Sequence, residues 1–152
     1  MKILFLDIDG PMVPRRAWIY NKRKGDNGEL AIFDPCATAM LITLLNLSEA
    51  KLVISSTWRL KGYERCARLL EDNGISAKYL HEDWHTHTDN NESRGDQIRK
   101  WLEKHPDVSH YVAVDDGYVD IEHLVKCSNT DGLMLEHFQE LAKWLEPDLS
   151  GD

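Results

Sequence analysis

Residues 2–10, Lys-Ile-Leu-Phe-Leu-Asp-Ile-Asp-Gly, join a short apolar run to two aspartates and a glycine. An uninterrupted apolar run of this length is typical of a buried strand in a parallel sheet. Such strands present functional residues at their carboxyl ends, where Asp7 and Asp9 stand. Gly10 allows the chain to turn away sharply. Two carboxylates in this place are suited to bind a hard cation and to attack a phosphoryl group.

The rest of the chain alternates strand-like apolar runs with helical patterns. The pattern predicts strands at 51–55, 77–80, 111–114 and 124–128, and helices at 35–47, 60–73, 94–104 and 133–145. Asp34 is the expected N-cap of the first of these helices, because Pro35 suits a first helical position. The alternation predicts an α/β fold: a three-layer, Rossmann-like parallel sheet with helices on both faces. Residues 81–93 are expected to form a polar loop.

The segment 11–33, which we call the flap segment, is expected to be irregular because it contains several prolines and glycines. It also carries five basic residues interleaved with aromatic ones: Arg15, Arg16, Lys22, Arg23 and Lys24, with Trp18 and Tyr20. Such a segment is most often a solvated loop. Alternatively, its cations would bind a phosphorylated backbone while Trp18 or Tyr20 stacks on a base.

Length and composition restrict the class of protein. The chain has 152 residues, enough for a single domain with a real core. Its net charge of −8 argues against nucleic-acid binding by bulk charge. It has no membrane-length apolar stretch and no signal-peptide pattern, so we expect a cytoplasmic protein without a membrane partner. Three widely spaced cysteines, Cys36, Cys66 and Cys127, are expected to be reduced thiols.

Polar residues follow three of the predicted strands, and another begins a predicted helix. They are Asp7 and Asp9, Ser55 and Ser56, Asp115 and Asp116, and Arg94. Because the carboxyl ends of parallel strands share one edge of a sheet, the fold should bring these side chains together.

In this order the motifs resemble those of the haloacid dehalogenase-like (HAD) superfamily of phosphohydrolases. The phrases at 53–59, Val-Ile-Ser-Ser-Thr-Trp-Arg, and at 94–102, Arg-Gly-Asp-Gln-Ile-Arg-Lys-Trp-Leu, are similar to a narrower branch. So is Thr-Asp-Gly-Leu at 130–133. That branch comprises HAD domains associated with RNA-repair proteins and related phage or bacterial phosphatases. The resemblance covers nearly the whole chain, so it implies one domain over 1–152, with the flap segment as a minimal cap over the site.

The resemblance implies a Mg²⁺-dependent phosphomonoesterase that works through an aspartyl-phosphate. Asp7 would be the nucleophile, Asp9 the general acid, and Arg94 the cation that neutralises the phosphoryl charge. Mg²⁺ would be bound by Asp7, the backbone carbonyl of Asp9, and Asp115 or Asp116.

Phosphate binding is assigned to a hydroxyl after the second strand, with Ser56 favoured by its spacing to Trp58, then Ser55, and Thr57 left open. Arg15 and Arg16 of the flap segment would contact the substrate. Candidate substrates are nucleic-acid ends, nucleotides and phosphoproteins; the oligomeric state is left open.

Three other hypotheses remain at this point. A receiver-like or other non-catalytic phosphoryl-binding module also gathers carboxylates, a hydroxyl and a cation on a parallel sheet, but in receivers the acidic pair follows the first strand. An interaction protein on a HAD scaffold would have lost residues of the catalytic motifs, and no motif here lacks its residues. His81, His85 and His87 suggest a metal site, although a polar surface loop is the simpler interpretation because partner cysteines and helical spacing are missing.

Overall fold

The computed structural model describes residues 1–23, 31–87 and 91–146. Within these residues, five strands form one sheet in the order β3-β2-β1-β4-β5, and every pairing is parallel. The strands are β1 (Lys2–Leu6), β2 (Lys51–Ile54), β3 (Leu80–His85), β4 (His110–Asp115) and β5 (Leu124–Lys126). The predicted α/β class is confirmed, with β1 at the centre of the sheet.

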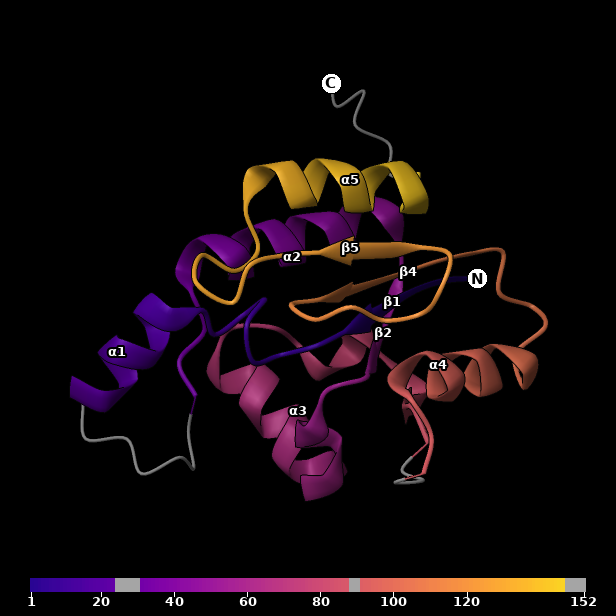
Figure 1. Cartoon of the computed structure of the whole chain (residues 1–152), viewed down its shortest axis with the longest axis horizontal. Coiled ribbons are helices and arrows are strands. Elements are labelled where there is room, and N and C mark those ends of the chain that lie inside the picture. The colour runs from indigo at the N-terminus through magenta and orange to yellow at the C-terminus, as the bar shows by residue number, and fades with distance from the viewer. Residues whose placement is uncertain (24–30, 88–90, 147–152) are drawn as a thin grey trace.

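Helices cover both faces of the sheet (Figure 1). They are α1 (Arg15–Arg23), α2 (Pro35–Ser48), α3 (Tyr63–Asp72), α4 (Arg94–Glu103) and α5 (Leu135–Leu145), with 3-10 turns η1 (Thr57–Lys61) and η2 (Ala77–Tyr79). Figure 1 shows α5 alongside α2 on one side of the strands and α4 on the other. No helix in the described part of the chain combines the length and apolar character needed to cross a bilayer.

Strand β1 is buried on both faces, as its apolar run predicts. Leu4 and Leu6 belong to the larger core cluster, which includes apolar residues of α2, α3 and α5. Ile3 and Phe5 point to the other face, where Phe5 packs edge-on against Trp101 of α4 with ring centres 5.4 Å apart. Because both faces of β1 are packed, the position of the strand is fixed, and so is the position of Asp7 at its carboxyl end.

The flap segment contains a helix, α1, where the sequence predicts irregular chain. Pro14 lies just before this helix, and its carbonyl accepts a hydrogen bond from the Trp18 amide. Proline suits a helix start as well as a turn, which is why it misled the prediction. Asn21 on the buried side of α1 exchanges hydrogen bonds with the backbone of Ile32 and so ties the helix to the returning chain. Gly25, Gly28 and Lys24 lie outside the described residues.

The edge strand β3 also differs from expectation. Residues 77–79 form the turn η2, where Ser76 accepts a hydrogen bond from the Lys78 amide, and the strand itself is Leu80–His85. Most of this strand falls in the predicted polar loop 81–93. Because β3 pairs on one side only, with β2, it accommodates half-exposed polar side chains that hide the strand pattern.

The N-cap of α2 is confirmed. Asp34 Oδ2 accepts the Ala37 amide at 3.1 Å, while its Oδ1 accepts Arg16 Nε at 2.9 Å.

We expect Asp34→Ala to lower the free energy of unfolding by about 1–2 kcal/mol, because it removes the cap. Asp34→Asn keeps a capping oxygen and weakens the half-exposed ion pair with Arg16. This variant should therefore lower the free energy of unfolding by less than about 1 kcal/mol. Urea unfolding of both variants checks this, and equal losses would contradict the capping role.

Candidate active site

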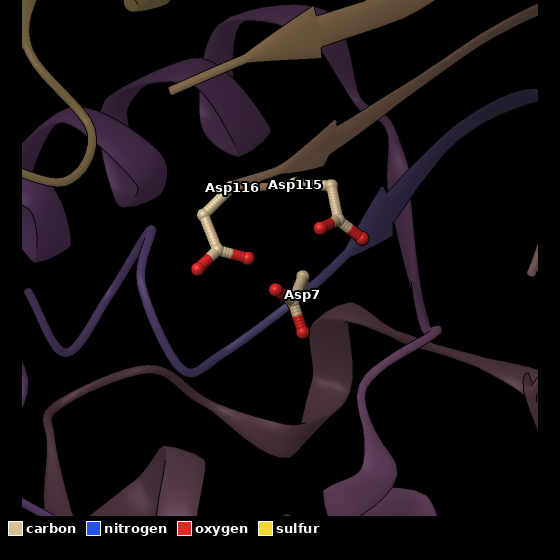
Figure 2. Close-up of side chains that lie close together, drawn as sticks. All are labelled: Asp7, Asp115 and Asp116. Carbon is tan, nitrogen blue, oxygen red and sulfur yellow. The ribbon is translucent and has the colours of Figure 1, made fainter. Parts of the chain in front are cut away.

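Three carboxylates meet at the carboxyl edge of the sheet. Asp7 directly follows β1, Asp115 ends β4, and Asp116 comes next in the chain. One oxygen from each lies within 4.8 Å of the other two. Figure 2 shows the three carboxyl groups pointing toward one another. Asp7 and Asp115 are buried and Asp116 is half-buried, so this predicted convergence is present in the fold.

Gly10 makes room for this cluster. Its backbone has φ +101°, a conformation that side-chain-bearing residues rarely adopt. A Cβ at this position would lie only 2.5 Å from Asp116 Oδ2. The glycine after the second aspartate is therefore needed both for the turn and for the space that Asp116 occupies.

Arg94, the first residue of α4, reaches the cluster from the side of the sheet opposite α2 and α5. Its Nη1 lies 3.4 Å from Asp7 Oδ1 and donates a hydrogen bond to Asp115 Oδ2. Ser93 caps the helix by accepting the Asp96 amide at 3.1 Å. A Cβ on Gly95 would lie 2.5 Å from the Asp120 carbonyl oxygen, so glycine allows this end of α4 to approach the loop after β4.

The electrostatic balance of the cluster is negative. Burial and the charge of Asp115 raise the pKa of Asp7 from its ordinary 3.8 to about 8, although Arg94 opposes the shift. Burial also raises the pKa of Asp116. Burial disfavours the charge on Arg94, but the hydrogen bond to Asp115 and the charge of Asp7 outweigh it and raise the arginine pKa. One guanidinium thus faces three carboxylates, and further positive charge would be stabilising.

The donor set fits a hard divalent cation such as Mg²⁺. Such ions prefer oxygen ligands, and Asp7, Asp115 and Asp116 offer only carboxylate oxygens. These three residues would hold the ion. The side chain of Asp9 stands apart from the cluster: it is exposed, and its Oδ2 accepts a hydrogen bond from Trp58 Nε1 at 3.2 Å. A metal contact through the Asp9 backbone carbonyl stays a prediction.

We expect the metal-free protein to lose stability as pH rises. The unfolded chain ionises Asp7 near pH 3.8, whereas the folded protein keeps its proton to about pH 8. The contribution of Asp7 to the free energy of unfolding is therefore greatest below about pH 4. It falls as the pH rises toward 8, by up to ~1.4 kcal/mol per pH unit.

Mg²⁺ should then raise the melting temperature strongly at pH 8 and little at pH 5, because protons compete with the metal. Calorimetry with EDTA or Mg²⁺ at the two pH values checks this. A Mg²⁺ effect that is larger at pH 5 would contradict it.

The serines after β2 lie beside β1, the strand that carries Asp7 at its carboxyl end. The Ser55 amide donates to the Leu6 carbonyl at 3.1 Å, which continues the β1–β2 pairing up to the site. Ser56 Oγ accepts the Trp58 amide at 3.3 Å and caps η1. Both serines are buried and Thr57 is exposed. The Ser56 hydroxyl can accept the capping bond and still donate its own proton to a phosphate. The assignment of Ser56, and then Ser55, to phosphate binding stays a prediction.

Arg59 is a structural residue of the site that the sequence did not single out. Its guanidinium is buried and donates to the carbonyls of Ser55 and Ser56 at 3.2 and 3.0 Å, and to Gln97 Oε1 at 3.0 Å. It thereby joins the chain at Ser55 and Ser56 to α4, which carries Arg94. Burial and the charge of Arg94 lower the pKa of Arg59. An arginine is normally exposed, so only the tertiary structure identifies this role.

Four of the five basic residues of the flap segment belong to α1, and the fifth, Lys24, lies outside the described residues. Arg15 and Arg16 are exposed, and Arg16 pairs with Asp34, the cap of α2. Trp18 and Tyr20 are also about half exposed. The side chains of Lys22 and Arg23 lie outside the described residues. Substrate contacts by Arg15 and Arg16 stay predictions.

The histidine segment belongs mostly to β3. His81 packs edge-on against Trp101 and His105, with ring centres 5.1 and 5.2 Å apart. His85 Nδ1 lies 2.8 Å from the Thr86 carbonyl. In the part of the chain that the structure describes, the carboxylate cluster is the one group of three or more such side chains that could hold a metal ion, and no histidine belongs to it. All three cysteines are free thiols.

Comparison with known families agrees with this geometry. Residues 3–138 match the family model described as the HAD domain in Swiss Army Knife RNA repair proteins. Searches find no significant match among curated proteins or solved structures. The matched residues include all the predicted site positions after the first strand: Asp7, Asp9, Ser55, Ser56, Arg94, Asp115 and Asp116. The chain therefore belongs to the HAD domains of Swiss Army Knife RNA repair proteins, within the HAD-type phosphohydrolase superfamily.

Proposed function

We propose that this protein is a Mg²⁺-dependent phosphomonoesterase that uses Asp7 as its nucleophile. The observation that carries the proposal is the contact of the Arg94 guanidinium with both Asp7 and Asp115, the two buried members of the three-carboxylate cluster. A cation that holds the nucleophile and also faces the incoming phosphate lowers the charge repulsion of the reaction. A purely structural ion pair would not need two further carboxylates beside it.

In the proposed reaction an Asp7 oxygen attacks phosphorus, a new O–P bond forms, and the bond to the leaving oxygen breaks. Asp9 gives a proton to the leaving oxygen. Water then attacks the aspartyl-phosphate, Asp9 takes its proton, and inorganic phosphate is released while Asp7 is regenerated. When bound, Mg²⁺ would supply positive charge against the repulsion between the carboxylate and the phosphate dianion.

The remaining residues would bind the phosphoryl group. Ser56 or Ser55 would donate a hydroxyl hydrogen bond, and Arg94 would neutralise phosphoryl oxygens. Loss of one such preorganised donor typically lowers transition-state stabilisation by roughly 3–4 kcal/mol. Arg59 would act on these groups only through the loop it holds.

For the substrate we propose a phosphorylated nucleic-acid end, a nucleotide or a phosphoprotein. The family description, which refers to RNA repair, supports including nucleic-acid ends. The exposed Arg15 and Trp18 on α1 supply a cation and an aromatic ring for such a ligand. A cytoplasmic location without a membrane partner is part of the same proposal.

Phosphate release tests the proposal. The substrates would be an aryl phosphate, nucleotides, 3′- and 5′-phosphorylated oligonucleotides and a phosphotyrosine peptide, each with Mg²⁺ or EDTA. We expect release that needs Mg²⁺ and falls by at least about 100-fold in Asp115→Asn.

The matched control is Asp72→Asn, which changes an exposed aspartate of α3 and should keep full activity. Equal release in EDTA and Mg²⁺, or an active Asp115→Asn protein, would reject the metal-dependent mechanism.

A further inference from the structure

The general acid Asp9 has an unexpected partner. Trp58 Nε1 donates a hydrogen bond to Asp9 Oδ2 at 3.2 Å, across 49 residues of sequence. Asp9 is exposed, whereas Trp58 is only 8% exposed. A buried indole therefore reaches out to an otherwise solvent-facing carboxyl group next to the nucleophile.

Trp58 is itself held from several sides. Its amide donates to Ser56 Oγ at 3.3 Å, and its carbonyl accepts the Cys66 thiol at 3.1 Å. Its ring packs in the larger core cluster, and Lys61 Nζ lies 3.9 Å from the ring centre. The indole N–H is thus a fixed donor, because the turn η1 and the core set its position before any substrate arrives.

We propose that Trp58 is a positioning residue for Asp9: it occupies Oδ2 and leaves Oδ1 as the oxygen that transfers the proton. The inference rests on the proposed phosphatase function. In the first step the proton moves from Asp9 Oδ1 to the leaving oxygen as its bond to phosphorus breaks. In the second step the same oxygen takes a proton from the attacking water. Without the indole, the exposed carboxyl group would sample other rotamers and be misplaced for both transfers.

The leaving group provides a readout that a general loss of structure would not produce. An alkyl alkoxide leaves poorly and needs a proton in the transition state, whereas p-nitrophenolate leaves without one. Misplacing the acid should therefore slow alkyl esters selectively.

The experiment compares kcat/KM for glycerol phosphate and p-nitrophenyl phosphate in wild type and Trp58→Phe, because kcat/KM reports the steps up to departure of the leaving group and not the later hydrolysis that both esters share. We expect kcat/KM for the alkyl ester to fall by at least ~10-fold, and kcat/KM for the aryl ester by less than ~3-fold. Trp144→Phe, a half-exposed tryptophan of α5, is the matched control and should change neither. In an Asp9→Asn background, Trp58→Phe should add no further loss on the alkyl ester. Equal losses on both esters, or an added loss in Asp9→Asn, would overturn the positioning role.

A second measurement keeps Trp58 in place, so it does not depend on how the phenylalanine variant folds. In ¹⁵N-resolved NMR spectra the Trp58 indole signal should move upfield in Asp9→Ala, and the other four indole signals should stay. An unmoved Trp58 signal would overturn the contact and with it the proposal. If the wild-type protein hydrolyses none of the panel substrates, nor glycerol phosphate, nor p-nitrophenyl phosphate, the phosphatase function itself is rejected. The inference about Trp58 would then fall with it.

Discussion

Asp7→Asn is expected to lower phosphate release by at least about 10⁴-fold and to raise the melting temperature of the metal-free protein. The loss follows because an amide cannot form an aspartyl-phosphate, and removal of a nucleophile typically has effects of this size or larger. Phosphate release under saturating substrate measures the loss.

The gain in stability follows from the site's electrostatics. Burial and Asp115 raise the pKa of Asp7 to about 8, so ionising this residue near neutral pH is unfavourable in the metal-free fold. A neutral amide removes that disadvantage, for a gain of about 2 kcal/mol. For a domain of this size the melting temperature should rise by roughly 5 °C in EDTA at pH 7.5.

The exposed-site variant Asp72→Asn serves as control for both measurements and should change neither. An active Asp7→Asn protein would reject the nucleophile. An inactive variant that melts well below wild type would show that the loss comes from unfolding rather than chemistry.

Arg94→Ala should lower phosphate release by about 10³-fold and destabilise the fold by about 3 kcal/mol. Its guanidinium is the group that contacts both Asp7 and Asp115, so the variant leaves buried carboxylates without a counter-charge. Mg²⁺ should recover part of the stability but not the activity, because the metal cannot replace the contact with the phosphoryl group.

Arg94→Lys distinguishes charge from shape. Lysine keeps the charge but not the forked guanidinium, so we expect activity within about 30-fold of wild type. Arg99→Ala, which removes an exposed arginine of the same helix, is the matched control. Full activity in Arg94→Ala would contradict the role assigned to this residue.

The sheet centre and the carboxylate cluster were predictable because each depends on a local signal. The apolar run of β1 marks a strand buried on both faces, and parallel strands bring Asp7, Asp115 and the serines to one edge whatever their separation in sequence. The Asp34 cap was predictable for the same reason: its hydrogen bond spans only three residues.

Edge and surface elements were less predictable. β3 carries polar side chains that only its edge position permits, and α1 follows a proline that also suits a turn. The roles of Arg59 and Trp58 depend on contacts made across the folded chain, 38 and 49 residues away. No periodicity or capping pattern encodes such contacts.

Chemical trapping of the phosphorylated enzyme tests the central claim most directly. The wild-type protein would be mixed with Mg²⁺ and its best substrate, quenched with borohydride, and mapped by peptide mass spectrometry. Borohydride reduces an aspartyl-phosphate to homoserine, and we expect this conversion at position 7, dependent on substrate and absent in Asp7→Asn. Hydrolysis that proceeds while position 7 stays unmodified, or homoserine at Asp9, Asp115 or Asp116 instead, would contradict the account.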